Sequence, residues 1–348
     1  MRILAVTQPN SGVGYHRIML PLSKLPGVYV LFTDFVNDEV LLKGFDIVLF
    51  NRFIPGLDIQ VLLAYREKYG FKIVVDIDDY WQLDPWHILY NGFPKAVIVH
   101  HIMTADLVTV THERLRDMVK GYNANCEILP NALPYGEDQF TDTKVEGIHG
   151  KDNGFEPTDR LRVLYAGGIT HEKDVQLLAN PMQRIAGDSH LRDRLFMIMA
   201  GYDDSNKHIT PIWDRMISDY LCGFKMSGYV RMPLPPDQYM AFYAEADIAL
   251  APLVPSIFNA CKSNVKVLEA GCKNIPIIVS NVAPYDACPH AVKVSRQSDW
   301  YANFKMLVKD KMYREYAGMK NGEWCREHHD LNKWNVTRKQ IYERLTAS

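Results

Sequence analysis

Residues 2–14 read RILAVTQPNSGVG, an apolar run followed by a loop of residues that interrupt regular structure. The apolar run is typical of a buried strand, and the spacing of Ile18, Leu22 and Leu25 predicts a helix directly after the loop. A strand, a glycine loop and a helix in this order open a doubly wound α/β unit. The same order returns at residues 161–168, which read LRVLYAGG and precede a helical pattern. The sequence therefore predicts two α/β halves.

The rest of the chain extends both halves. Helical patterns separate several further apolar runs, so each half is expected to hold a mainly parallel sheet covered on both faces. Residues 131–159 lack apolar periodicity and carry several Gly and Pro, which predicts a linker or an exposed loop. We expect an α/β fold of two Rossmann-like domains facing across a cleft, at residues 1–156 and 157–325, and a C-terminal helix at 326–348 that packs back on the first. The further strands are expected at residues 28–32, 46–50, 72–77, 107–110, 127–129, 195–200, 247–251, 275–279 and 291–294.

Composition excludes several classes of protein. The 348 residues are 47% hydrophobic and 23% charged with a net charge of -2, which is ordinary for a globular chain and untypical of disordered or collagenous ones. Six scattered cysteines without a CxxC pair suggest neither a zinc site nor a disulfide framework. We expect a cytoplasmic protein whose membrane contact, if any, is peripheral, because no apolar run is long enough for a signal peptide or a membrane span. Nucleic acid is not an expected partner, although a local basic cleft is compatible with this charge.

Two candidate sites follow strands of the first half. Gly12 and Gly14 let backbone N–H groups approach an anion, while His16 and Arg17 put positive charge in the first helical turn. A tight strand-to-helix turn explains the same glycines, and Arg17 at the third glycine position of G-x-G-x-x-G disfavours a dinucleotide dehydrogenase.

The second of these sites is the acidic cluster of Asp76, Asp78 and Asp79. It has three interpretations. The first is a metal site of the Asp-x-Asp type. The second is a site for sugar hydroxyls beside the aromatic side chains of Trp81 and Trp86, and the third is a solvated capping cluster.

Two more candidate sites follow strands of the second half. Gly168 precedes His171 and Lys173, either of which could face a phosphate, although a capped surface helix is the alternative. Residues 258–271 read FNACKSNVKVLEAG, in which Ser263 or Asn264 is expected to cap a helix. Lys262 and Lys266 near that helix start suit a diphosphate, and Glu269 on the face of Lys266 suits ribose hydroxyls. An ordinary amphipathic helix with a Lys–Glu pair is the alternative.

The stretch from Lys262 to Gly271, followed by an apolar strand at residues 275–280, resembles the donor-binding signature of glycosyltransferase family 4, whose members have the GT-B fold. Glu269 matches the glutamate that holds the donor ribose in that family. Many members carry a second glutamate eight positions earlier, where this sequence has Cys261. The arrangement is instead similar to a divergent subgroup with a Lys-Ser-x-x-Lys-x-x-Glu motif, common in bacterial and phage surface-glycan loci.

The resemblance implies transfer of a sugar from a nucleotide diphosphate sugar, most simply a UDP- or GDP-sugar, to an acceptor hydroxyl in glycan synthesis. It implies retention of configuration and no requirement for a metal or cofactor. The first domain is expected to serve the acceptor and the second the donor. The implied catalytic residues are Asp78, Lys262 and Glu269. The implied donor-binding residues are Gly12, Gly14, Gly168, His171, Lys173, Lys262, Ser263, Asn264, Lys266 and Glu269, and the acceptor-side residues are His16, Arg17, Asp76, Asp79 and Trp81.

Four other functions stay open at this point. Asp76 and Asp78 are compatible with a metal-dependent transferase, which activity in the presence of EDTA would contradict. The same fold also suits a nucleotide-sugar epimerase, a binding protein without turnover, and a phage enzyme that glycosylates a DNA base. The near-neutral charge argues against the last, because phosphate contacts need Lys and Arg.

Overall fold

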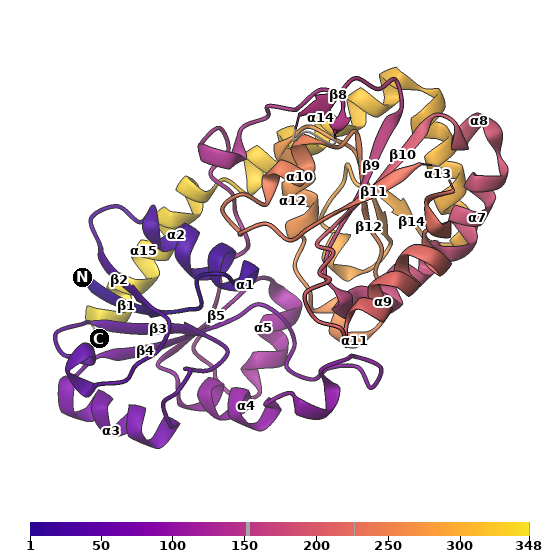
Figure 1. The fold of residues 1–348 in the computed structure, drawn as a ribbon. Helices are drawn as coiled ribbons and strands as arrows, with labels where there is room; N and C mark the ends of the chain where they lie inside the picture. Colours follow the sequence, from indigo (N-terminus) through magenta and orange to yellow (C-terminus); the bar gives the residue numbers. More distant parts are fainter. Residues whose placement is uncertain (151–153, 226, 348) are drawn as a thin grey trace. The chain divides into compact units, whose positions relative to one another are not determined.

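The computed structural model describes residues 1–150, 154–225 and 227–347 (Figure 1). The chain divides into two compact units, which we call the first and the second domain. The first domain consists of Met1–Pro134, Ala260–Ser263 and His329–Ser348, and the second of Tyr135–Asn259 and Asn264–His328.

The first domain is built on a parallel sheet, which has six strands among the described residues, in the order β2-β1-β3-β4-β5-β6 (Figure 1). Its strands read as near-continuous apolar runs because both faces are covered, as expected for a parallel sheet. The order reverses between β1 and β3, where Ile3 lies opposite Ile47. The strands are β1 (Arg2–Val6), β2 (Tyr29–Thr33), β3 (Ile47–Asn51), β4 (Lys72–Ile77), β5 (Leu107–Val110) and β6 (Cys126–Ile128).

Helices cover both faces of this sheet. One face packs against α3 (Ile59–Tyr69), α4 (Lys95–Thr104) and α5 (Glu113–Lys120). The other packs against α2 (Leu20–Ser23) and the C-terminal helix α15 (Leu331–Ala347), and Ile341 and Tyr342 of α15 join the same apolar cluster as Ile3. The amide of Asn335 on α15 donates to the carbonyl oxygens of Pro21 at 2.9 Å and Lys24 at 3.1 Å. The last helix is therefore part of the core of the first domain.

Local sequence sets the limits of these helices. The side chain of Asp58 accepts from the backbone N–H of Gln60 at 2.8 Å and begins α3. Gly70 ends α3 with a φ of 77°, a left-handed conformation that glycine adopts without strain. In the same way the ring of His112 caps α5 by accepting from Leu115 N–H at 3.3 Å.

The second domain holds another parallel sheet, which has six strands among the described residues, in the order β11-β10-β9-β12-β13-β14. Counted from its own first strand, this is the order 3-2-1-4-5-6 of dinucleotide-binding folds, with the reversal between β9 and β12. The strands are β9 (Leu161–Ala166), β10 (Leu195–Ala200), β11 (Gly228–Arg231), β12 (Ile248–Ala251), β13 (Ile277–Ser280) and β14 (Val292–Val294), with a separate hairpin of β7 (Ile148–His149) and β8 (Phe155–Glu156).

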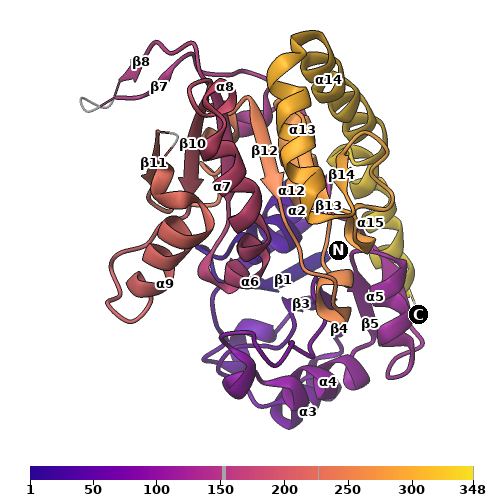
Figure 2. The same cartoon turned by 90° about the vertical axis from the view of Figure 1, so that its right-hand side faces the viewer.

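Helices again cover the second sheet, and α13 and α14 lie side by side on this domain (Figure 2). Helix α12 packs very closely on α14. A Cβ on Gly271 of α12 would lie 2.5 Å from Cys325 Sγ, and one on Gly318 of α14 would lie 2.2 Å from the Asn274 carbonyl oxygen. The helices are α6 (Glu172–Val175), α7 (Ala179–Gly187), α8 (Ser189–Arg192), α9 (Thr210–Arg215), α10 (Met240–Ala244), α11 (Ile257–Ala260), α12 (Val265–Cys272), α13 (Gln297–Lys309) and α14 (Lys311–His328).

The predicted α/β class with two Rossmann-like domains is confirmed by these two sheets. The expectation of a linker or exposed loop at residues 131–159 is wrong around Phe140, which is buried, because Lys273 Nζ donates to the carbonyl oxygens of Gln139 and Thr141 on either side of it. The edge strand β11 was not predicted, since its four residues carry no apolar periodicity. In the described part of the chain, no helix combines the length and apolar character needed to cross a membrane.

Candidate functional site

The loop after β1 folds into one helical stretch made of α1 (Gly12–Gly14), a π-turn (Tyr15–Met19) and α2. Ser11 Oγ accepts the N–H of Gly14 at 3.1 Å. A Cβ on Gly14 would lie 2.3 Å from Thr7 Oγ1, whereas one on Gly12 would have no neighbour within 4 Å. Packing therefore explains Gly14, and only Gly12 offers open space for a ligand. His16 lies edge-on to the ring of Tyr15, with centroids 5.3 Å apart.

Arg17 and Asp76 form a buried ion pair in the first domain. Arg17 Nε and Nη2 donate to the two carboxylate oxygens at 3.0 and 2.7 Å, and the side chains are only 2% and 3% exposed. Thr109 Oγ1 donates to the same carboxylate at 2.7 Å. Burial alone would lower the pKa of Arg17, but the charge of Asp76 raises it above its ordinary value. Through Asp76 on β4 and its hydrogen bond from Thr109 on β5, this pair links the carboxyl ends of these two strands.

Asp78 and Asp79 lie in a second, more open cluster of charges. Arg52 Nε and Nη2 each donate to Asp78 at 3.1 Å, and the Asn51 amide donates to it at 3.0 Å. Burial would raise the pKa of Asp78, but the Arg52 charge and the Asn51 amide outweigh it and lower that pKa. Asp79 Oδ2 lies 3.4 Å from Arg52 Nη2 and 3.5 Å from Lys262 Nζ. Both carboxylates therefore lie within ion-pair distance of cationic side chains.

The two predicted aromatic platforms differ in exposure. Trp81 is 3% exposed and lies in the apolar core of the first domain, edge-on to Tyr122, so packing occupies its ring. Trp86 is 51% exposed. It belongs to a segment with Ile88, Leu89 and Tyr90, each of which is also about half exposed.

The predicted donor motif is divided between the domains, because Lys262 and Ser263 belong to the first and Asn264 to the second. His112 Nε2 lies 3.1 Å from the carbonyl oxygen of Cys261, which anchors this short segment to the first domain. Ser263 Oγ accepts from Asn131 Nδ2 at 2.7 Å, and Asn131 Oδ1 accepts from Arg17 at 3.1 Å. This chain of hydrogen bonds joins Ser263 to the buried ion pair.

In the second domain, Gly167 and Gly168 follow β9, the strand beside the reversal of the sheet. A Cβ on Gly167 would lie 2.8 Å from Tyr165 Oη and 3.5 Å from Lys266 Nζ, so only glycine fits there. Lys266 reaches across from α12 and donates to the carbonyl oxygen of Ala166. The hydroxyl of Tyr165 is buried without a hydrogen-bond partner. The turn thus joins a lysine, an unsatisfied hydroxyl and two glycines.

His171 and Lys173 lie just beyond this turn. The ring nitrogen Nδ1 of His171 lies 2.8 Å from Asp174 Oδ2, and the His171 side chain is 18% exposed. Lys173 is exposed, with Nζ 3.4 Å from Gln176 Oε1. The structure therefore brings Gly168, His171 and Lys173 to the carboxyl end of β9.

Helix α12 carries the remaining predicted donor residues. Asn264 occupies the N-cap position, but its side chain makes no capping bond and lies 3.7 Å from Cys288 Sγ. Glu269 is only 3% exposed and takes a hydrogen bond from the hydroxyl of Tyr243. Burial, followed by the nearby Glu269 carboxylate, raises the pKa of Tyr243 well above its ordinary value, so this tyrosine stays a neutral donor.

Among the polar residues around these clusters that sequence reasoning missed are Asn51, Arg52, Asp174 and Tyr243. A signal existed for Asn51 and Arg52, which end an apolar strand next to the one that carries Asp76. Arg52 has a φ of 61°, which is uncommon outside glycine and marks a constrained position. Asp174 and Tyr243 gave no sequence signal, because each lies inside a helical pattern.

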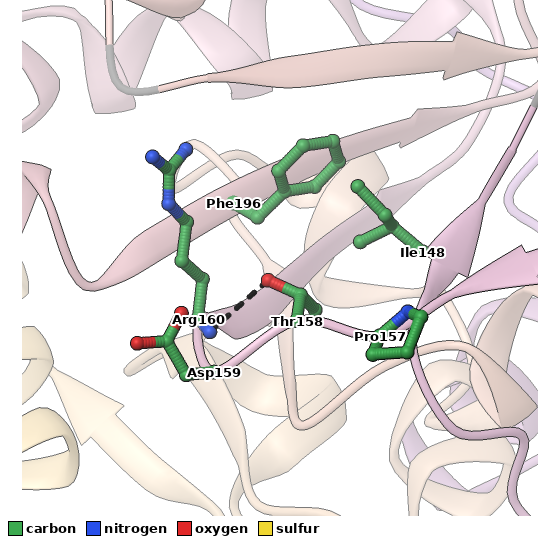
Figure 3. A pocket seen from close by; sticks show the side chains of 6 residues that line it. All are labelled: Ile148, Pro157, Thr158, Asp159, Arg160 and Phe196. Carbon is green, nitrogen blue, oxygen red and sulfur yellow. Dashed lines mark hydrogen bonds between the residues drawn. The ribbon is translucent and has the colours of Figure 1, made fainter.

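A separate pocket of about 480 Å³ lies near the amino ends of β9 and β10, whereas the predicted donor residues follow the carboxyl ends of the strands (Figure 3). Phe196 and Ile148 give it an apolar side, and the backbone N–H of Arg160 donates to Thr158 Oγ1 at 3.2 Å. Its lining residues are Ile148, Pro157, Thr158, Asp159, Arg160 and Phe196. Ligands of open α/β sheets bind at the carboxyl ends of strands, so this pocket is distinct from the predicted donor residues.

No group of three or more His, Cys, Asp and Glu side chains arranged for a metal ion occurs among residues 1–150, 154–225 and 227–347.

No protein-family model and no curated protein sequence matches the chain. Solved structures do resemble it. A sucrose-phosphate synthase from Thermosynechococcus elongatus is 14% identical with a TM-score of 0.74, covering 100% of this chain and 99% of that one. HepE from Anabaena, in complex with UDP-glucose, is 12% identical with a TM-score of 0.69 and full coverage of both chains. The trehalose-6-phosphate synthase OtsA is 12% identical with a TM-score of 0.62, covering 87% of this chain and 73% of that one.

At these identities the likeness concerns the fold. It confirms the predicted GT-B type, with two Rossmann-like domains, over the full chain. The likeness by itself assigns no role to any residue.

Proposed function

We propose that this protein is a glycosyltransferase that moves a sugar from a nucleotide diphosphate sugar to an acceptor hydroxyl. The observation that carries the proposal is on the second domain, where Lys266 of α12 adjoins the Gly167-Gly168 turn at the reversal of the sheet and the buried Glu269 follows three residues later on the same helix. Such a reversal is where open α/β sheets bind nucleotides. The likeness to a UDP-glucose complex over the full chain gives independent support.

The second domain supplies groups suited to the ribose and the diphosphate of the donor. We assign the ribose hydroxyls to the buried Glu269 carboxylate, to which the Tyr243 hydroxyl donates. Lys266, His171 and Lys173 suit the diphosphate, as do the first backbone N–H groups of α12. A UDP- or GDP-sugar is the proposed substrate.

The chemistry follows from where charge develops. As the bond from the sugar to the diphosphate breaks, negative charge grows on the departing phosphate oxygens. Fixed cations and helix-end N–H groups stabilise that charge more in the transition state than in the ground state, and this accelerates transfer. We assign this role to Lys266.

We further propose that transfer needs no metal ion and retains the anomeric configuration. The oxygens of Asp76 already accept from Arg17 and Thr109, and those of Asp78 from Arg52 and Asn51, so a divalent cation would have to displace these donors. Retention rests on the family resemblance. Activity is expected to persist in EDTA, and NMR of the product is expected to show the donor's anomeric configuration.

For the acceptor we propose the cluster of Asp78, Asp79 and Arg52 on the first domain. Asp79 is the more exposed of its two carboxylates, with 22% of its side chain accessible. The chain leaves this cluster after Asp79 and returns at Phe93, whose ring centroid lies 5.9 Å from Arg52 Cζ. Between these points lies the exposed apolar segment from Trp86 to Tyr90, which we propose as a peripheral membrane contact. A glycan acceptor at a lipid surface would then reach the cluster.

A thermal-shift screen against UDP-, GDP-, ADP-, TDP- and CDP-sugars tests the donor assignment. A bound donor raises the unfolding temperature by mass action, so one nucleotide class should stand out. Glu269→Ala and Lys266→Ala are expected to lose that shift, while Glu323→Ala, which changes an exposed carboxylate on α14, retains it. Release of the nucleoside diphosphate only when acceptor is present would then establish transfer.

The assignment would be overturned if the Glu269 and Lys266 variants, shown to be folded, kept the full shift. Binding without any turnover across a panel of sugar acceptors would instead support a binding protein. Interconversion of the donor without acceptor would support an epimerase.

A further inference from the structure

Asp174 is a buried carboxylate that none of the roles above uses. It is 4% exposed and sits on α6, three residues after His171. Its Oδ1 accepts two hydrogen bonds, from the backbone N–H of Val254 at 2.8 Å and from Asn259 Nδ2 at 2.9 Å. Its Oδ2 lies 2.8 Å from His171 Nδ1. A buried carboxylate is costly unless such bonds satisfy it, so this arrangement is a specific one.

These contacts join the two loops that flank the reversal of the second sheet. His171 follows β9, whereas Val254 and Asn259 follow β12, the neighbouring strand. The Asn259 amide also donates to the Val254 carbonyl oxygen at 3.0 Å, which fixes the orientation of that amide. Asp174 therefore ties the His171 ring to the strand on the other side of the expected nucleotide position.

The carboxylate determines which ring nitrogen of His171 carries a proton. An ionised Asp174 can only accept, so Nδ1 must donate, and the opposite nitrogen Nε2 points away from Asp174. With Nδ1 protonated and paired to a carboxylate, a second proton on Nε2 turns the ring into a cation that donates outward. His171 would then be a charged donor beside the Gly167-Gly168 turn.

We propose that Asp174 is a positioning residue: it accepts from protonated Nδ1 of His171 and thereby favours the doubly protonated ring, whose Nε2–H donates to a phosphate oxygen of the nucleotide diphosphate. The proposal rests on the proposed function and names one more group that meets the diphosphate.

The other charged and titratable neighbours are compatible with this role. Burial, followed by the Asp174 charge, raises the pKa values of Tyr165 and Tyr285, so both stay neutral. Glu172 Oε1 forms an ion pair with Arg215 Nε at 2.5 Å. Lys173 extends from the exposed side of the same short helix, and Lys266 is bound to the Ala166 carbonyl oxygen.

Asp174→Asn tests this directly. It reverses the direction of the hydrogen bond with His171 and keeps the two bonds from Val254 and Asn259. Val254 and Asn259 both donate to Oδ1, so the asparagine must place its oxygen there and turn its NH₂ group towards His171. Nδ1 then becomes an acceptor, and the ring is held as the neutral tautomer with a proton on Nε2. The variant should fold, because the shape and two of the three bonds remain.

The first measurement is the tautomer of His171 by two-dimensional ¹⁵N NMR of histidine-labelled protein, assigned with His171→Ala. We expect the wild type to have Nδ1 protonated and Asp174→Asn to have only Nε2 protonated. As the matched control, Asn259→Ala removes one donor to Oδ1 but leaves the His171 bond, and it should keep the wild-type tautomer. A wild-type ring with its proton on Nε2 alone would overturn the proposal.

The second measurement compares a nucleoside diphosphate with its nucleoside, taking the pair of UDP, GDP or ADP that binds best, by calorimetry. Loss of a charge-assisted hydrogen bond should weaken diphosphate binding by about tenfold or more in Asp174→Asn and leave nucleoside binding unchanged. Asp174→Asn in a His171→Ala background should cause no further loss. Equal weakening of both ligands would overturn the proposal. Failure of the wild type to bind any nucleoside diphosphate would instead overturn the proposed function, and the phosphate contact of His171 would fall with that function. The tautomer measurement would still show whether Asp174 positions His171.

Discussion

Replacing Arg17 by methionine removes the guanidinium from the buried ion pair while filling a similar volume. The change leaves Asp76 as a carboxylate with only 3% side-chain exposure and without its bidentate partner. It also removes the donors that satisfy the Leu129 carbonyl oxygen at 2.7 Å and Asn131 Oδ1 at 3.1 Å. Breaking a buried pair by removing one partner costs about 3–5 kcal/mol. We expect the free energy of unfolding of the first domain to fall by about this amount.

Native-state hydrogen exchange followed by mass spectrometry can measure the effect in each domain separately. Peptides from β4 and β5 report on the first domain and peptides from β10 on the second. Protection should fall in β4 and β5 of Arg17→Met and stay unchanged in β10. As a control, Arg192→Ala removes an exposed ion pair with Asp193 and should leave protection in both domains unchanged.

A double variant keeps the reasoning testable if Arg17→Met does not fold. Arg17→Met combined with Asp76→Leu removes both charges, and apolar replacement of a buried pair is often neutral. The double variant should therefore be more stable than either single one. The reasoning is wrong if Arg17→Met lowers the stability of β4 by less than about 1 kcal/mol, or if the double variant loses the sum of both single effects.

Three other predictions concern different parts of the molecule. Burial would raise the pKa of Asp78, but the Arg52 charge outweighs it and lowers that pKa below 3.8. The ionised carboxylate therefore stabilises the fold above about pH 4, and this contribution is lost as the pH falls through the pKa of the folded state. The free energy of unfolding should fall less steeply with decreasing pH in Asp78→Asn than in the wild type. Gly318→Ala places a Cβ 2.2 Å from the Asn274 carbonyl oxygen and should destabilise the second domain by about 1–3 kcal/mol in thermal unfolding, whereas Gly187→Ala, with open space around it, should not. Wild-type protein should sediment with lipid vesicles and Trp86→Ser/Leu89→Ser should not, and equal sedimentation of the two would argue against the proposed membrane contact.

Sequence reasoning succeeded where one periodic signal determines the structure. The apolar runs after Arg2 and Leu161 identified both sheets, because buried parallel strands need continuous apolar sequence. Helix limits at Asp58 and Gly70 follow from local capping. The edge strand β11 gave no such signal, since an edge strand buries less of its surface.

The candidate site was predictable only in part, for a related reason. Residues that follow strands could be placed at the carboxyl edges of the sheets, and this located Asp78, Gly168 and His171. Which partner each side chain meets depends on pairs far apart in sequence, such as Asp174 with Asn259 or Arg17 with Asp76. Local pattern carries no information on those pairs. Lys262 and Asn264 belong to different domains although they are two residues apart. For the same reason, the local pattern could not predict this division.

The placement of α15 in the core of the first domain has a consequence for synthesis of the protein. The ribosome makes β1 to β6 first, but α15 emerges about 200 residues after Pro134, or roughly 10–40 s later at common rates of elongation. Until then the apolar face that includes Ile3 and Leu49 lacks the side chains of Ile341 and Tyr342. The second domain, made of residues translated in between, has the opportunity to fold first. A nascent chain of this protein should therefore depend on chaperones through its N-terminal half, although that half leaves the ribosome earliest.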